Sequence, residues 1–138
     1  ALGARQTSEN FFDKNGLIDF EKLTKSEKFQ RAINKVIEVS TRGYNVALMC
    51  SEADPSECHR FSIISQYLAK HNFSVKHILK DGRIIDNENL IEELLKKYMS
   101  KLPKLPLLSQ LTKEDSIDFI FKEINKKIIK LKQRSGQQ

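Results

Sequence analysis

The chain has 138 residues, of which 39% are apolar and 30% charged, a composition typical of a globular domain rather than of a disordered segment. No apolar run approaches the roughly 20 residues that a membrane span needs, and the first residues lack the basic-then-apolar order of a signal peptide. Two cysteines without an export signal predict free thiols and a cytoplasmic location.

The formal charge of +6 lies mainly near the C-terminus. Residues 1–91 hold 13 Lys and Arg against 12 Asp and Glu, whereas residues 92–138 hold 11 against 6. A basic C-terminal helix can contact the phosphate backbone of a nucleic acid, but lysines on a long helix are more often its solvated face. Acidic residues interrupt the run and aromatic side chains for base stacking are few, so both interpretations stay open.

The first half of the chain predicts a helix and then a buried strand. Apolar residues at 23–37 recur at helical spacing, Ser26 or Thr24 can cap this helix, and Gly43 ends it. The next apolar run, 46–50, is continuous, which is typical of a strand covered on both faces in a parallel sheet.

The second half predicts a further strand between helices. Residues 54–57 (DPSE) supply an N-cap, a proline at the first helical position and a capping box, for a helix to about position 71. A strand at 73–79 then precedes a turn signal, Asp81-Gly82.

The remaining segments predict two helices joined by a connector. A helix covers 87–98, and the connector at 102–111 is extended because it holds two prolines. Thr112 or Asp115 caps the last helix, which runs to about Lys132 and precedes a disordered tail.

This order predicts an α/β fold, a small three-layer domain with a mainly parallel sheet flanked by helices and a C-terminal helical extension. We expect residues 1–111 to form the α/β domain. Residues 112–138 are expected to form a basic helix and a disordered tail packed on the same domain.

The carboxyl edge of the predicted sheet gathers the residues most capable of chemistry. Ligands bind at that edge in open parallel sheets, and Cys50 would end the first strand there. The loop after Cys50 runs into a helix N-terminus, whose free N–H groups favour an anion or a thiolate. We predict catalytic roles for Cys50 and His59, and ligand-binding roles for Ser51, Glu52, Arg60 and His77.

Each of these residues also has a purely structural interpretation. Cys50 at a strand end and Cys58 on the apolar face of a helix can be inert buried thiols. His59 can be a surface histidine, and His77 a partly buried, hydrogen-bonded one. Arg60 can bind an anion through both guanidinium edges, or it can brace the loop through nearby acidic residues.

Spacing argues against three specific chemistries. Nine residues separate Cys50 from Arg60, whereas a tyrosine-phosphatase-like loop needs five. A zinc site from Cys50, Cys58, His59 and His77 has suitable ligand types, but it lacks the usual tight spacings, and adjacent Cys58 and His59 would leave a helix in different directions. A redox pair is disfavoured because seven residues separate the cysteines, instead of two. We therefore predict no metal and no cofactor.

The segment 46–60 (VALMCSEADPSECHR), followed by SVKHILKDG, resembles the domain of unknown function 488 family. That family joins an apolar strand, Cys-x-Glu, a proline and Cys-His-Arg to a later strand with a valine–x–His–Ile step. Leu2-Gly3 is similar to its upstream Leu-Gly-Gly element, with Ala4 where a second glycine is usual. The resemblance runs from about residue 2 to 95. It implies a small α/β fold with a parallel sheet and no generally established activity.

The family's first strand, ending near Thr-Ile-Gly-His, and its later Asp-Val-Arg segment do not occur in this sequence. We therefore expect the chain either to begin inside the domain or to be a divergent short form. A sheet edge left uncovered in this way would favour self-association by strand pairing.

Three functions follow from these observations. The first is binding of an anionic small ligand at residues 50–60 of a cytoplasmic protein, with or without thiol chemistry, which leaves open whether the protein is an enzyme. The second is a basic module that associates with nucleic acid or nucleotides. The third is a structural or interaction domain without catalysis, and none of the three involves a membrane.

Overall fold

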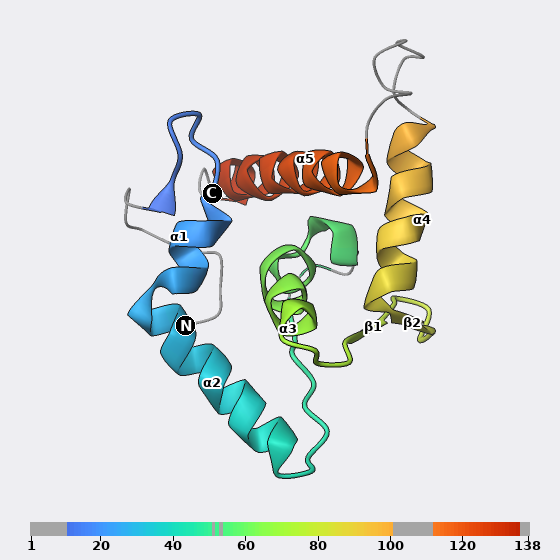
Figure 1. Cartoon of the computed structure of the whole chain (residues 1–138). Helices are drawn as coiled ribbons and strands as arrows, with labels where there is room; N and C mark the ends of the chain where they lie inside the picture. The colour runs from blue at the N-terminus through green and yellow to red at the C-terminus, as the bar shows by residue number, and fades with distance from the viewer. Residues whose placement is uncertain (1–10, 51, 53, 101–111, 136–138) are drawn as a thin grey trace.

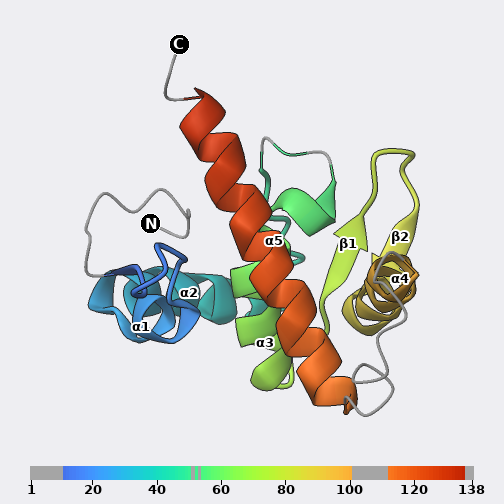
Figure 2. The same cartoon turned by 90° about the horizontal axis from the view of Figure 1, so that it is seen from above.

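The computed structural model describes residues 11–50, 52, 54–100 and 112–135, and it is mainly helical (Figure 1). The elements are, in chain order, α1 (Phe20–Lys25), α2 (Glu27–Thr41), η2 (Pro55–Glu57), η3 (Arg60–Ser65), α3 (Gln66–Lys70), β1 (Lys76–Ile78), β2 (Ile84–Asp86), α4 (Asn87–Met99) and α5 (Lys113–Ser135). η2 is a 3₁₀-helix and η3 is a π-helix that continues into α3. α1 and α2 lie on one side of α3, α4 and the strands lie on the other, and α5 crosses over it (Figure 1 and Figure 2).

The predicted three-layer α/β fold with a mainly parallel sheet is wrong. Within the described residues the sheet has two strands only, β1 and β2, which pair antiparallel with His77 opposite Ile85. The predicted turn at Asp81-Gly82 joins them, and Gly82 has the positive φ of +83° that such a turn favours. Because the turn is tight, β1 pairs with the strand that follows it rather than with an earlier one.

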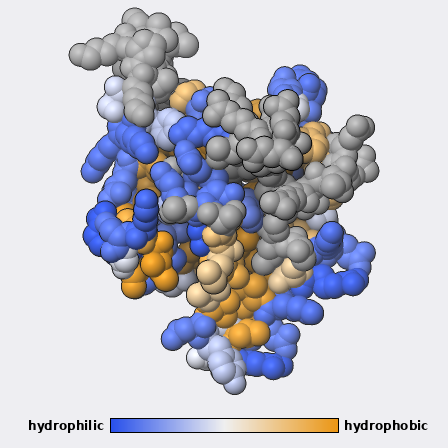
Figure 3. Space-filling view, turned by 180° about the vertical axis from the view of Figure 1, so that it is seen from behind, coloured by the Kyte–Doolittle hydropathy of each residue, from blue (hydrophilic) through white to orange (hydrophobic). Residues whose placement is uncertain are grey.

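The apolar run at 46–50 does not form the predicted first strand. Leu48 packs on the core, but Val46 is 40% exposed and Met49 is 92% exposed. Seen from behind, the molecule shows apolar surface gathered in the lower part of the view (Figure 3). The continuous apolar character of this run therefore comes from one core contact and exposed side chains, not from burial on both faces.

The first predicted helix is present but divided in two. Ser26 has an extended backbone with ψ at 140°, so α1 ends there, and its hydroxyl caps α2 by accepting a hydrogen bond from the backbone N–H of Phe29 at 3.3 Å. Gly43 follows the last turn of α2 with φ at +88°. The predicted N-cap and glycine stop are thus both confirmed.

The helix predicted over 54–71 is present as three pieces of different winding, η2, η3 and α3. η3 is buried on every side, since all of its residues from Phe61 to Ser65 are buried. Ile63 and Ile64 pack against α1, α2 and α3, while Phe61 packs against α4 and α5. Because its apolar side chains enter two different clusters, helices enclose η3 on both sides.

The two predicted C-terminal helices are present as α4 and α5. Their buried apolar side chains are Leu90, Leu94, Ile120 and Ile124. Thr112 caps α5, because its hydroxyl accepts a hydrogen bond from Asp115 N and the Asp115 carboxylate accepts one from Thr112 N, each at 3.1 Å. The predicted connector at 102–111 and the tail after 135 lie outside the described residues. Among the described helices, none combines the length and apolar character needed to cross a bilayer.

A buried asparagine joins the two ends of the described chain. The side chain of Asn125 on α5 donates a hydrogen bond to the carbonyl oxygen of Ile18 at 2.8 Å and accepts one from its N–H at 3.3 Å. Both residues are buried, so water does not replace these bonds. The amide of Asn125 therefore acts as an extra strand partner for the loop that precedes α1.

We predict that Asn125→Ala lowers the free energy of unfolding by about 2–4 kcal/mol, because two buried backbone groups lose their partners. Urea denaturation at constant pH measures this change. Asn89→Ala is the matched control, since Asn89 is an exposed asparagine on α4, and its effect should stay within about 0.5 kcal/mol. Equal effects of the two substitutions would contradict the role assigned to Asn125.

Candidate functional site

Four side chains with metal-ligating atoms come together beside the start of η3. They are Cys50, Glu52, Cys58 and His59, and their ligating atoms all lie within 4.8 Å of one another. The Cys50 thiol donates a hydrogen bond to the Glu52 carboxylate, and its Sγ lies 3.7 Å from Nδ1 of His59. Cys58 is fully buried and the other three are half-buried.

Arg60 holds the two chain segments of this cluster together. Its guanidinium donates hydrogen bonds to the carbonyl oxygens of Leu48 (2.9 Å) and Glu52 (3.3 Å), on the segment that carries Cys50. Its Nε and its backbone N–H donate to Sγ of Cys58, at 3.2 and 3.4 Å. Arg60 therefore braces the loop through carbonyl groups and a sulfur atom.

A break in the helical winding lets adjacent residues reach the same centre. η2 ends at Glu57 and η3 begins at Arg60, so Cys58 lies outside both helices. The expectation that Cys58 and His59 diverge assumes a regular helix, and the chain does not have one here. The change from 3₁₀ to π winding within a few residues lets the side chains of Cys58 and His59 both approach Cys50.

The cluster does not present a ready thiolate. The pKa of Cys50 is raised to about 11, first by burial and then by the contacts with Cys58 and Glu52. A thiol with this pKa is a poor nucleophile at neutral pH. The donor set is instead the kind that a borderline-soft divalent metal prefers: two sulfurs, one imidazole nitrogen and one carboxylate oxygen.

The structure brings together four of the six predicted site residues. Cys50, Glu52, His59 and Arg60 lie in or against the cluster. Ser51 lies outside the described residues. The fold also brings in Cys58, which the sequence pattern assigns to the core: it is buried, and it points its sulfur into the cluster as well.

His77 lies outside this cluster and contacts Phe61 and Asn87 instead. Its Nε2 is 3.0 Å from Oδ1 of Asn87 at the start of α4, and its ring packs edge-on against Phe61 at 5.5 Å. Gln66 donates a second hydrogen bond to the same Asn87 oxygen at 3.4 Å, so that oxygen is an acceptor and His77 carries its proton on Nε2. The predicted alternative of a buried, hydrogen-bonded histidine describes these contacts.

Two buried asparagines with structural roles have only weak signals in the sequence. Asn87 bonds to His77 and Asn125 bonds to Ile18, and each lies in line with the apolar side chains of its helix. A polar residue that interrupts an apolar helical stripe is the signal that could have identified them.

Comparison with known proteins gives one family. Residues 2–68, just under half of the chain, match the family model described as Domain of unknown function DUF488. The match contains Cys50, Glu52, Cys58, His59 and Arg60, and it ends before β1, short of the predicted limit near position 95. No match was found among curated proteins or solved structures.

We predict that the stability contributed by His77 is lost as the pH falls. Burial lowers its pKa below the usual 6.5, so the unfolded chain binds a proton that the folded protein excludes. The contribution is complete above the unfolded pKa and declines as the pH drops from about 6.5 toward the folded value. Urea denaturation between about pH 5 and 8 should show this decline in the unmodified protein.

His77→Gln should remove most of this dependence on pH, even though it also lowers stability at every pH. His71→Gln is the control, because it removes an exposed histidine and leaves the contacts of His77 intact. An unchanged pH dependence in His77→Gln would contradict the assignment.

Proposed function

We propose that this chain, whose residues 2–68 match the DUF488 family model, is a metal-binding protein with a zinc-type centre at Cys50, Glu52, Cys58 and His59. The observation that carries the proposal is the convergence of these four donor groups from two chain segments. Four protein ligands complete a tetrahedral shell, which is typical of structural rather than catalytic zinc. The ion would tie the segment after α2 to the start of η3.

The distances suit such a centre after small adjustments. Bonds of about 2.0–2.3 Å to a tetrahedral ion place its ligand atoms about 3.3–3.8 Å apart. The 3.7 Å between Cys50 Sγ and His59 Nδ1 already falls in this range, and no pair in the cluster exceeds 4.8 Å. Side-chain rotations that move the ligand atoms by about 1 Å would complete the tetrahedral shell without a change in the helices.

Charge also balances in the proposed centre. Two thiolates and a carboxylate around a divalent ion leave one net negative charge, and the Arg60 guanidinium next to Cys58 supplies one positive charge. The N–H groups that Arg60 directs at sulfur stabilise a thiolate, as outer partners of metal ligands do. Both cysteines are free, and the cytoplasm for which the sequence argues keeps thiols reduced.

The predicted anion site fits these contacts less well. The guanidinium of Arg60 already donates to two carbonyl oxygens and a sulfur, and Glu52 brings a carboxylate into the cluster. An anion would have to displace these partners and approach a negative group. In our proposal Cys50, His59 and Glu52 are ligands of a cation, Arg60 positions them, and His77 takes no part.

We predict that the reduced, full-length chain binds one zinc ion, measured by elemental analysis after gel filtration. Cobalt in place of zinc should give a thiolate-to-cobalt charge-transfer band and the visible bands of tetrahedral coordination. Cys50→Ser should weaken zinc binding by more than about 100-fold, beyond the usual cost of losing an outer partner.

Two matched pairs of variants separate ligation from general charge effects. Glu52→Gln should weaken zinc binding, and Glu57→Gln, five residues later on η2, should not. His59→Gln should weaken it, and His71→Gln should not. A chain that binds no zinc, or a cobalt complex without the sulfur band, would refute the proposal.

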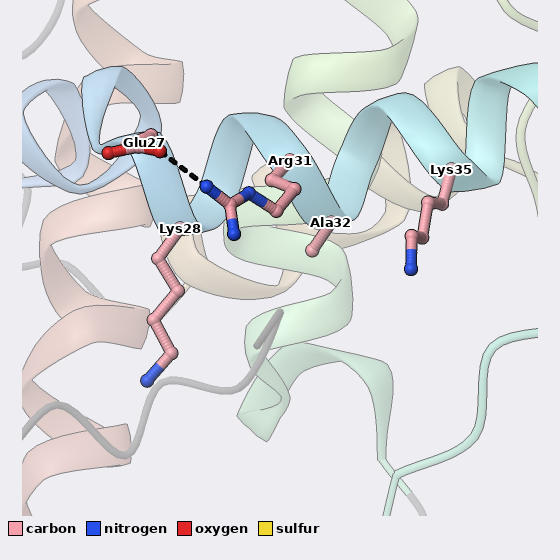
Figure 4. A pocket seen from close by; sticks show the side chains of 5 residues that line it. All are labelled: Glu27, Lys28, Arg31, Ala32 and Lys35. Carbon is pink, nitrogen blue, oxygen red and sulfur yellow. Dashed lines mark hydrogen bonds and ion pairs between the residues drawn. The ribbon is translucent and has the colours of Figure 1, made fainter.

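A second candidate function is binding to a phosphate backbone, and the observation that favours it lies on α2. Lys28 and Lys35 extend from the same side of α2, around a shallow pocket of about 340 Å³, and Arg31 between them pairs with Glu27 (Figure 4). In the described part of α5, where the sequence places the basic surface, Lys126 instead pairs with Glu123 at 2.6 Å. The basic row of α2 is therefore the better candidate for nucleic-acid contact.

For this second candidate we predict filter binding of a single-stranded oligonucleotide that weakens steeply with salt. Lys28→Glu with Lys35→Glu should lower the affinity about tenfold or more. Lys22→Glu with Lys25→Glu makes the same charge change on α1, at lysines that already pair with Asp19 and Glu21, and should have a smaller effect. No binding at low salt would exclude this function.

A further inference from the structure

The two cysteines of the proposed centre also lie close enough to react with each other. Their sulfur atoms lie within 4.8 Å of each other in the same cluster, and the Cys58 side chain is within hydrogen-bonding reach of the Cys50 thiol. Seven residues separate them in the sequence, which disfavours a redox pair by spacing alone. The fold removes this objection, because the chain turns back through η2 and brings them together.

We propose that Cys50 and Cys58 form a redox-active dithiol, and that a peroxide converts them to a disulfide and so expels the metal ion. This inference rests on the proposed metal centre for the release step, but not for the formation of the disulfide. It adds a chemical activity, the two-electron reduction of a hydroperoxide, to a site that would otherwise only hold an ion.

The surroundings of the two sulfurs give them different roles. Cys58 is fully buried, and Arg60 directs two N–H groups at its sulfur. Cys50 is half-buried on the segment before η2, so it is the sulfur that a small oxidant reaches first. Cys50 is therefore the attacking residue, and Cys58 is the resolving residue that completes the disulfide.

The reaction balances with a peroxide as the oxidant. As a zinc ligand Cys50 would already be a thiolate, whereas in the metal-free chain the thiol must first lose its proton, so the reaction is slower there. The thiolate attacks one peroxide oxygen, the O–O bond breaks, and the sulfur becomes a sulfenic acid while the other oxygen leaves as water or an alcohol. The Cys58 sulfur then attacks Cys50 Sγ, an S–S bond forms, and the sulfenic oxygen leaves as water. Two protons are taken up in total, and two electrons pass from sulfur to oxygen.

Loss of the metal follows from loss of its ligands. A disulfide sulfur carries no negative charge, so two of the four proposed ligands disappear in one reaction. Glu52 and His59 alone do not complete a tetrahedral shell, and water takes the vacant positions. A thiol reductant reverses the reaction and restores the four donors.

The test treats the zinc-loaded, full-length chain with hydrogen peroxide at one equivalent. Released zinc is followed with a chromogenic chelator, and thiols are blocked before intact mass spectrometry and peptide mapping. The expected result is one zinc ion released for each Cys50–Cys58 disulfide, and recovery of binding after reduction and addition of zinc. Zinc release with only sulfinic or sulfonic acid at Cys50, or with disulfides between chains, would overturn the proposal.

A second arm uses the metal-free, reduced chain, so that the two proposals fail separately. If the chain binds no zinc but still forms the disulfide within one chain, the metal centre fails and the dithiol stands. If the chain binds zinc but forms no such disulfide, the metal centre stands and the dithiol proposal fails. Cys50→Ser should abolish disulfide formation, and its fold can be checked by circular dichroism, which avoids dependence on variants of the buried Cys58.

Discussion

The hydrogen bonds of the Arg60 side chain are the contacts on which the candidate site depends. They join the carbonyl oxygens of Leu48 and Glu52 to the sulfur of Cys58, and so connect the segment after α2 to the beginning of η3. No strand pairing holds the 46–50 segment in place. A planar guanidinium with five donors can bridge three acceptors at once, and a lysine ammonium cannot reproduce that geometry. The position of Cys50 thus follows from the position of Arg60.

The fold could be predicted where local chemistry decides it and not where packing does. Ser26 and Gly43 set the limits of α2 through capping and positive φ, and Gly82 sets the hairpin turn, so each of these features was readable from a few neighbouring residues. The strand at 46–50 was predicted wrongly because an apolar run is consistent with burial but does not require it. The parallel sheet and the three layers depended on that strand, and they failed with it.

Most residues of the candidate site could be identified from the sequence, although the predicted structural reason for their proximity was wrong. Cys50, Glu52, His59 and Arg60 do come together, but at a reversal of the chain rather than at the edge of a sheet. Spacing rules for ligands assume regular helices and strands, and the change of winding at Cys58 breaks that assumption. The prediction that His77 belongs to the site depended on a parallel sheet. Because β1 and β2 form an antiparallel hairpin, His77 lies elsewhere.

The pairing of Asn125 with Ile18 has a consequence for the order in which the protein is made. The two residues are 107 positions apart, so a ribosome must synthesise most of the chain after Ile18 before its partner exists. Until α5 emerges, the backbone groups of Ile18 lack their partner, and the cluster around Phe61 lacks Ile120 and Ile124. Contacts of such long range close late and slowly, because the chain between the two residues must first give up its freedom. The nascent protein would therefore hold the Phe61 side of η3 incompletely covered until α5 has been synthesised.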